Sequence, residues 1–352
     1  MAKNPTFSIA GREISAAHPP YIIAELSANH MGSIDRAFQM IDAAHAAGAD
    51  AVKLQTYEPD KITMKSNKPD FQIEGGLWAG RSYHDLYQEA MTPKEWHKPL
   101  FEHAHSLGLT IFSSPFDLEA VDFLETLNAP AYKIASFELV DLALVKKAAS
   151  TAKPLIMSTG LASREDIEDA VTAAQEGGAT QIALLHCVSA YPTPPEDANL
   201  RTIKLLADTF GVPTGLSDHT LTEAVPVAAS ALGAQIIEKH FTLSREEGGA
   251  DAAFSLEPDE FKRMADAVRI AHSALGTAQL GTIAAEKDSL KGRRSLYFNK
   301  SLSAGHKIEE GDIVSVRPGL GLKPKHLDSL MGKPLAHAVE RGQAIQWDDF
   351  DN

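Results

Sequence analysis

Short apolar runs with strand character recur along the first 240 residues of the chain, and a segment of helical period follows each run. This alternation is typical of parallel α/β folds, and eight repeats predict a closed (β/α)8 TIM barrel. The eight predicted strands are residues 21–24, 51–54, 110–112, 131–135, 155–157, 182–185, 212–216 and 235–237.

An open doubly wound sheet is the competing fold. Such a sheet places a glycine-rich phosphate turn after its first strand, whereas residues 25–30 contain no glycine. The barrel is therefore the better interpretation. Helix starts support the alternation: Ser163 is a predicted N-cap, and Thr92 is predicted to cap a helix whose first residue is Pro93.

Two regions depart from the barrel repeat. Residues 58–91 exceed a normal loop and predict either a lid that contacts substrate or a plain surface loop. After residue 276 the pattern changes, so we expect a barrel domain over residues 1–280, a polar linker over 281–293 and a small β-rich domain over 294–352. The small domain has predicted strands at 295–298, 313–317 and 344–347.

Charge and cysteine content narrow the class of protein. The formal net charge is −14 without a long basic run, which argues against nucleic acid and anionic membranes as partners. The single cysteine, Cys187, excludes an intramolecular disulfide and fits a reducing compartment. The polar N-terminus lacks the apolar core of a signal peptide, so we expect a cytoplasmic protein.

Two histidines end the seventh and eighth predicted strand regions. Adjacent parallel strands lie about 4.8 Å apart, so His219 and His240 at equivalent strand ends can share a divalent cation. Asp218 and Glu238 lie beside them in the sequence and can supply oxygen ligands. The alternative is that both are ordinary solvated loop histidines.

Other polar residues also end the predicted strands, and in a TIM barrel they meet at one face. Lys53 and Lys133 share the inward period of these residues, and a buried ammonium requires a neutralising anion. With nearby serines they predict a phosphate cradle, while internal salt bridges to Glu25 or Glu138 are the alternative. Phosphate binders, a divalent metal and a free carboxylate suit the condensation of a phosphorylated substrate with a carbonyl compound.

These motifs resemble the sialic acid synthase family, and most closely its pseudaminic acid synthase branch. The resemblance covers nearly the whole chain and includes a tail similar to the antifreeze-like (SAF) domain of these enzymes. The matching segments are residues 23–30, 52–57, 112–117, 132–138, 158–160, 189–197, 215–220, 238–242 and 293–319.

The resemblance implies a transferase that condenses phosphoenolpyruvate with an open-chain amino-sugar aldehyde and depends on Mn²⁺, with Mg²⁺ or Co²⁺ as alternatives. Glu25 would be an acid/base group, and His219 and His240 would hold the metal. Arg317 would reach the partner's sugar within a domain-swapped homodimer. The residues implied to bind phosphoenolpyruvate are Lys53, Ser114, Lys133, Ser136, Ser158, Ser189 and Ser217, and those implied to face the sugar are Gln55, Tyr191 and Asp251.

The acceptor implied for the pseudaminic branch is 2,4-diacetamido-2,4,6-trideoxy-altrose. Ser189 favours this branch, because N-acetylneuraminate synthases usually have asparagine there. Met31 departs from the family, which commonly has a second asparagine at this position. The alternatives are an N-acetylneuraminate or legionaminate synthase, a metal-dependent aldolase that does not use phosphoenolpyruvate, and a saccharide- or ice-binding protein without turnover.

Overall fold

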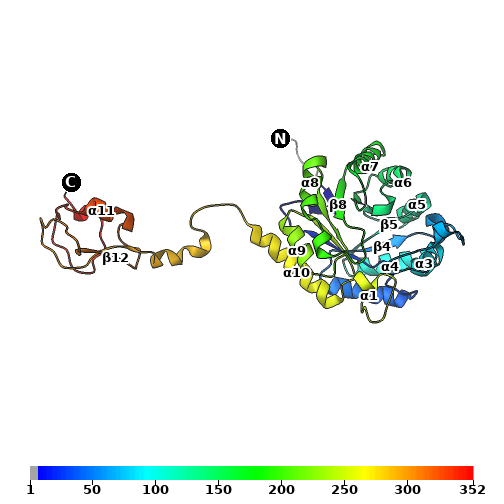
Figure 1. Cartoon of the computed structure of the whole chain (residues 1–352), viewed down its shortest axis with the longest axis horizontal. Helices are drawn as coiled ribbons and strands as arrows, with labels where there is room; N and C mark the ends of the chain where they lie inside the picture. Colours follow the sequence, from blue (N-terminus) through cyan, green and yellow to red (C-terminus); the bar gives the residue numbers. More distant parts are fainter. Residues whose placement is uncertain (1–6, 352) are drawn as a thin grey trace. The chain divides into compact units, whose positions relative to one another are not determined.

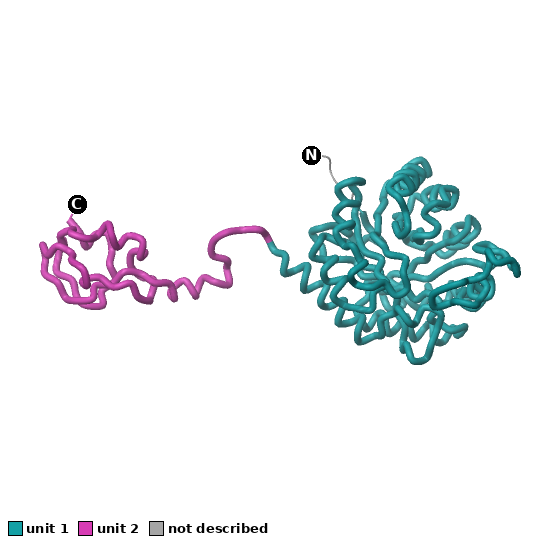
Figure 2. Tube along the Cα trace, viewed as in Figure 1, with its two compact units in different colours: residues 1–276 teal, residues 277–352 magenta. Residues whose placement is uncertain are grey.

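The computed structural model describes residues 7–351, which form two compact units (Figures 1 and 2). The first unit comprises residues 1–276 and the second comprises residues 277–352. The first unit is a closed barrel of eight parallel strands, so the predicted TIM barrel is confirmed and the open sheet is excluded. Its strands, in chain order, are β3 (Tyr21–Glu25), β4 (Ala51–Thr56), β5 (Thr110–Pro115), β6 (Tyr132–Ile134), β7 (Leu155–Ser158), β8 (Ile182–Cys187), β9 (Thr214–Asp218) and β10 (Ile236–His240).

Helices cover the outside of the barrel (Figure 1). Within the described residues, each strand is followed by one helix of this layer. These helices are α1 (Ile34–Ala46), α4 (Lys94–Ser106), α5 (Leu118–Thr126), α6 (Leu142–Ala149), α7 (Arg164–Glu176), α8 (Arg201–Phe210), α9 (Ala224–Ala231) and α10 (Pro258–Leu275). None of the described helices has both the length and the apolar character needed to cross a membrane.

One predicted helix cap is confirmed and one is wrong. Ser163 accepts a hydrogen bond from the backbone N–H of Asp166, whose side chain accepts one in return, so α7 begins with a capping box. Helix α4 begins at Lys94 rather than Pro93, and Thr92 does not cap it. The Thr92 hydroxyl lies instead within 3.4 Å of His30 Nε2, because a tertiary partner is available to it there.

The period of two along the strands divides the core into two layers. On β3, Ile22 and Ala24 pack outward against the helices, whereas Tyr21 and Ile23 fill the barrel interior with side chains such as Phe112. Each of these large side chains is fully or almost fully buried, and such burial contributes about 2–3 kcal/mol for a large apolar side chain.

A hairpin packs into the lower end of the barrel. Strands β1 (Phe7–Ile9) and β2 (Arg12–Ile14) pair antiparallel, with Phe7 opposite Ile14. Both side chains, together with Ile9, join the apolar cluster of the barrel interior. The amino-terminal end of the barrel is therefore filled by apolar side chains, and the polar residues are left at the opposite end.

The insertion predicted at residues 58–91 follows β4 and has secondary structure of its own. It contains α2 (Pro59–Ile62), η1 (Pro69–Phe71) and α3 (Tyr83–Ala90). The backbone N–H of Ile73 donates to the carbonyl of Arg81, and the N–H of Gly80 donates to the carbonyl of Ile73. These hydrogen bonds close the segment into a compact arm. Short 3-10 turns η2 (Ser136–Glu138), η3 (Pro195–Asp197) and η4 (Ala252–Phe254) lie in other loops of this unit.

The second unit has its own small apolar core, which includes Leu296, Phe298, Ile345 and Phe350. Strands β11 and β12 confirm two of the predicted strands, but residues 344–347 make only an isolated bridge and then enter a 3-10 turn. The elements of this unit are η5 (Ala284–Glu286), η6 (Asp288–Gly292), β11 (Ser295–Phe298), β12 (Ile313–Val316), η7 (Pro324–His326), α11 (Leu327–Leu330) and η8 (Trp347–Asp349).

Candidate functional site

The inward parity of the strands brings polar side chains together at the carboxyl end of the barrel. On β3 the series Tyr21, Ile23, Glu25 ends in a carboxylate, and on β10 the series Ile236, Glu238, His240 ends in a carboxylate and an imidazole. Strand pairing places Glu25 beside both Lys53 and His240. A ring of charged groups therefore lies directly above the apolar interior.

These residues form the floor of a cavity of about 660 Å³. All the predicted site residues line it except two. Ser114 lies behind the floor and accepts a hydrogen bond of 3.0 Å from Lys53. Arg317 belongs to the second unit, where it lines a shallow depression with Arg293 and Arg294.

The two lysines have carboxylate partners inside the barrel. Lys53 forms an ion pair with Glu25, and its Nζ lies 3.6 Å from Glu238 Oε1. Lys133 Nζ lies 3.2 Å from the same Glu238 oxygen and forms no ion pair with Glu138. The internal salt bridges considered above are thus present, with Glu238 in place of Glu138 as the second acid.

The carboxylates of Glu25 and Glu238 differ in proton affinity. Burial raises the pKa of Glu25, and the charge of Glu238 raises it further against the effect of Lys53. Burial also acts on Glu238, but the two lysines outweigh it and lower its pKa. A proton therefore favours Glu25, and a protonated Glu25 leaves two ammonium groups facing one carboxylate. That state has a net positive charge and suits an anionic ligand.

Hydroxyl groups surround the same floor. The Oγ atoms of Ser158 and Ser189 are buried and have no hydrogen-bond partner within the described residues. Gly160 lies between Ser136 and Ser189, and a Cβ at this position would come within 2.4 Å of Ser189 Oγ and 2.7 Å of Ser136 Oγ. Glycine thus keeps open a small cradle of donors, which is what a phosphate or carboxylate group requires.

The two histidines face each other across this cavity, with their ring centroids 5.2 Å apart. His219 Nδ1 lies 2.9 Å from the carbonyl of Val188, which fits an Nδ1–H donor and leaves Nε2 as an acceptor. Burial, followed by the neighbouring His219, lowers the pKa of His240 well below its usual value. A neutral imidazole is the form that binds a metal.

The fit of a metal to these residues is partial. His240 Nδ1 is buried and has no hydrogen-bond partner among the residues that the structure describes, and Asp251 Oδ2 is 3.8 Å from it. No set of three or more His, Cys, Asp or Glu side chains in residues 7–351 is arranged as a complete metal cage. Two imidazoles suit a divalent cation whose remaining ligands are water or substrate oxygens. The donor set therefore fits such an ion without enclosing it.

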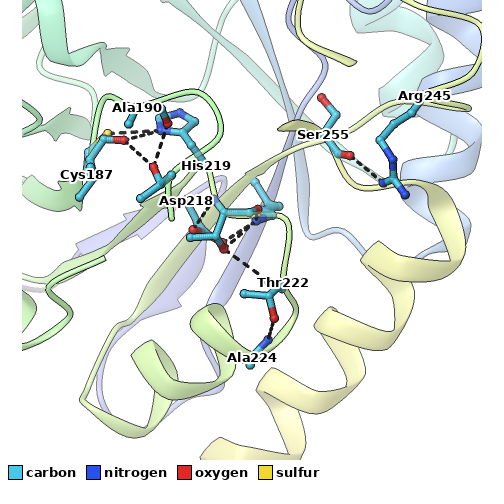
Figure 3. Close-up of polar contacts among 12 residues, drawn as sticks. Cys187, Ala190, Asp218, His219, Thr222, Ala224, Arg245 and Ser255 are labelled. Atoms are coloured by element: carbon cyan, nitrogen blue, oxygen red, sulfur yellow. Dashed lines mark hydrogen bonds and ion pairs between the residues drawn. The ribbon is translucent and has the colours of Figure 1, made fainter. Parts of the chain in front are cut away.

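Close contacts hold His219 in place. Figure 3 shows Cys187 beside the His219 ring, with Sγ 3.8 Å from Nδ1. The ring of Tyr191 lies 4.5 Å from the ring of His219, measured between centroids. Cys187 is buried and lines the cavity of the site.

Aromatic side chains line the upper part of the cavity, and two of them, Trp78 and Phe254, were not among the predicted site residues. Trp78 of the insertion donates from Nε1 to the carbonyl of Ala250 at 2.9 Å. Its ring lies 5.7 Å from Tyr191 and 6.3 Å from Phe254. Asp251, next to Ala250, accepts a hydrogen bond from Ser27, and burial raises its pKa.

Glu138 is a further candidate that was considered only as a salt-bridge partner. It lines the cavity, and its Oε2 is buried without a hydrogen-bond partner in the described part of the chain. Burial raises its pKa to about 7. The single sequence signal for this role is its place two residues after Ser136, at a strand end of the barrel.

Comparison with known proteins gives two domain matches. Residues 40–280 match the NeuB family, and residues 293–351 match the SAF domain. The first match covers most of the barrel and all but one strand of the site ring.

Relatives match along nearly the whole chain. The pseudaminic acid synthase of Campylobacter jejuni is 46% identical over 94% of this chain and 96% of its own length. The pseudaminic acid synthase of Helicobacter pylori is 43% identical over 95% of this chain and 98% of its own length. The crystal structure of an N-acetylneuraminic acid (sialic acid) synthetase from Leptospira borgpetersenii is 32% identical, with a TM-score of 0.73 over 82% of this chain and 96% of that chain.

Proposed function

Since the chain belongs to the NeuB family of sugar acid synthases, we propose that it condenses phosphoenolpyruvate with 2,4-diacetamido-2,4,6-trideoxy-altrose as a pseudaminic acid synthase. The products are a nine-carbon 2-keto sugar acid and inorganic phosphate. The observation that carries this proposal is the cavity floor, where two buried lysines lie near serine hydroxyls that have no hydrogen-bond partner within residues 7–351.

Phosphoenolpyruvate carries a phosphate and a carboxylate, and the floor offers matching donors. Charge-assisted hydrogen bonds from ammonium groups to such anions are the strongest that the site can make. Glu25 and Glu238 already form ion pairs with the two lysines. Phosphoenolpyruvate must therefore replace these ion pairs when it binds the ammonium groups. The residues proposed to hold this substrate are Lys53, Ser114, Lys133, Ser136, Ser158, Ser189 and Ser217.

His219 and His240 are proposed to hold a divalent cation, Mn²⁺ before Mg²⁺ or Co²⁺, which when bound polarises the acceptor's carbonyl oxygen. In the condensation, C3 of phosphoenolpyruvate attacks the aldehyde carbon, water adds to C2, and the bond from C2 to the phosphate oxygen breaks. Glu25 lies between Lys53 and Gln55, whose Nε2 donates to its Oε1 at 3.1 Å. From this position it can take the proton of the water or give one to the new hydroxyl.

The acceptor is proposed to lie above the floor, against Gln55, Tyr191 and Asp251. The protein is proposed to be a homodimer in which Arg317 of the SAF domain reaches the sugar in the partner's barrel. In this arrangement the proposed barrel domain comprises residues 1–280, the linker residues 281–293 and the SAF domain residues 294–352. A cytoplasmic location suits the single free cysteine.

An acceptor panel tests the proposal. The purified chain is incubated with phosphoenolpyruvate, Mn²⁺ and either the trideoxy-diacetamido sugar, its legionaminate-type isomer or N-acetylmannosamine. Phosphate release and product mass are measured, and we expect the first sugar to give the highest kcat/KM. Preference for another sugar would reassign the acceptor. Formation of an aldol product in the absence of phosphoenolpyruvate would indicate an aldolase. No turnover with any of the sugars would contradict the assignment as an enzyme.

A further inference from the structure

We infer that the insertion between β4 and α4 selects the acceptor by presenting an apolar wall to it. This wall consists of Ile62, Ile73, Leu77, Trp78 and Leu86, all of which line the cavity. The inference rests on the proposed function and adds the class of group that the wall recognises. That class is methyl groups, at a deoxygenated chain end and on acylated amines, in place of the hydroxyls of a polyhydroxy sugar.

Charge in the insertion is sharply segregated. Residues 58–91 include ten Asp, Glu, Lys and Arg side chains, yet none of these ten lines the cavity. The insertion instead contributes the apolar wall, two tyrosines, two glycines and an alanine to the lining. Since the charges lie elsewhere on the arm, the side facing the cavity is selectively apolar.

The two ends of the cavity therefore differ in chemistry. Lysines, serines and histidines form the floor, where the reacting carbonyl must lie beside His219 and His240. The rest of the acceptor extends from this carbonyl toward the opposite end, which the wall lines. Leu77 is 47% exposed there, so it offers apolar surface that a bound methyl group can cover.

The wall is held in place before any acceptor binds. The hydrogen bonds between Ile73 and Arg81 and between Gly80 and Ile73 fix its hairpin. The indole of Trp78 is anchored on the carbonyl of Ala250, and Ser82 caps α3 ahead of Leu86. A preformed apolar surface discriminates better than a flexible one, because it cannot rearrange to offer hydrogen bonds.

A hydroxyl at the wall would lose its hydrogen bonds to water, and the aliphatic side chains of the wall cannot replace them. A methyl group in the same place gains from burial. Discrimination by one such group in a pocket is typically about 10- to 100-fold. We therefore expect selection of this size between acceptors that differ only in a terminal methyl or hydroxymethyl group.

The test uses a matched pair of acceptors, the 2,4-diacetamido-2,4,6-trideoxy sugar and its counterpart with the 6-hydroxyl present. Both are assayed with wild type and with Ile73→Thr and Leu86→Gln, which place polar atoms on the wall; Ile73→Thr also shortens the side chain by one heavy atom. Ile62→Thr serves if the variants at the two more buried positions do not fold. Met64→Thr is the control, because Met64 belongs to the insertion but is 65% exposed and does not line the cavity.

We expect wild type to prefer the deoxy sugar about 10- to 100-fold in kcat/KM, and each wall variant to reduce that ratio about tenfold, mainly through the acceptor KM. The KM for phosphoenolpyruvate should not move, and Met64→Thr should keep the wild-type ratio. Condensation of both sugars at equal rates by wild type would overturn the inference that the wall selects the acceptor, and it would leave the synthase assignment intact. An unchanged preference in folded wall variants would also overturn it, whereas no condensation at all would overturn the proposed function itself.

Discussion

Lys239 Nζ lies 2.6 Å from Asp218 Oδ2, and this fully buried ion pair joins the residues that directly precede His240 and His219. Both side chains have the outward parity of their strands, so they lie behind the cavity rather than in it. Thr220 completes the group, because its backbone N–H donates to Asp218 Oδ1 at 3.0 Å. The pair therefore fixes the spacing of the two strand ends that carry the histidines.

We predict that Lys239→Met lowers the free energy of unfolding by about 3 kcal/mol, because it leaves Asp218 buried without its cation. The same variant should weaken Mn²⁺ binding, although Lys239 does not line the cavity. Urea unfolding and calorimetric titration with Mn²⁺ measure the two effects. Asp218→Asn and the double variant complete the cycle, and additive effects on Mn²⁺ affinity would show that the pair does not position the histidines.

Removal of either facing histidine should abolish tight Mn²⁺ binding. His219→Ala and His240→Ala each leave one imidazole, which is too few protein ligands to retain the ion. His103→Ala is the matched control, because this histidine pairs with Asp42 on the helical layer, away from the cavity. Isothermal titration of the folded proteins measures the affinity, and wild-type affinity in His219→Ala would refute the metal site.

Glu25→Gln should lower kcat by about 10²- to 10⁴-fold, the range expected when a general acid or base is lost. The amide keeps the size of the side chain and can still contact Gln55, so the floor should stay folded. It also frees Lys53 from its ion pair, and the KM for phosphoenolpyruvate should therefore not rise. Steady-state kinetics separate these effects. A variant with normal kcat but a raised KM would mean that Glu25 only positions Lys53.

Glu138 should make stability depend on pH. Its folded-state pKa of about 7 lies above the ordinary value of 4.5, so between these values the folded state binds more protons than the unfolded state. Stability from this group is present below pH 4.5 and is lost as pH rises through 7. Glu138→Gln cannot ionise, so its stability relative to wild type should increase between pH 5 and pH 8, by up to about 3 kcal/mol.

Urea unfolding of both proteins at several pH values checks this trend. Glu102→Gln is a suitable control, because Glu102 is an exposed residue of α4 whose partner Lys98 is 3.9 Å away. Glu102 does not line the cavity, so this variant should not reproduce the rise expected for Glu138→Gln. A flat difference for Glu138→Gln would contradict the raised pKa.

The barrel and most of its polar ring could be predicted because both follow from the period of two along the strands. Glu25, Lys53 and His240 share the inward parity of apolar neighbours, and that parity is visible in the sequence. The ion pairs between these side chains were harder to predict, because they depend on which side chains face each other across the barrel. Lys133 therefore contacts Glu238, which is 105 residues away, rather than the nearby Glu138.

Other features depended on tertiary contacts that local pattern does not contain. Thr92 has the sequence position of a cap but lies against His30 instead. Residues 344–347 have strand character, yet only Ala344 forms a bridge. The apolar face of the insertion has neither a regular period nor a motif, because its members come from a short hairpin and from two helices, α2 and α3.

The hairpin of β1 and β2 has a kinetic consequence. Within the described residues, Phe7, Ile9 and Ile14 fill the amino-terminal end of the barrel, so a ligand reaches the floor of the cavity from the carboxyl end, where the insertion lies. A ligand at the floor must therefore bind before a ligand in the upper part of the cavity and dissociate after it, because the upper ligand blocks its route. With phosphoenolpyruvate at the floor, as proposed, phosphoenolpyruvate would bind before the sugar. Phosphate would dissociate only after the longer sugar acid product.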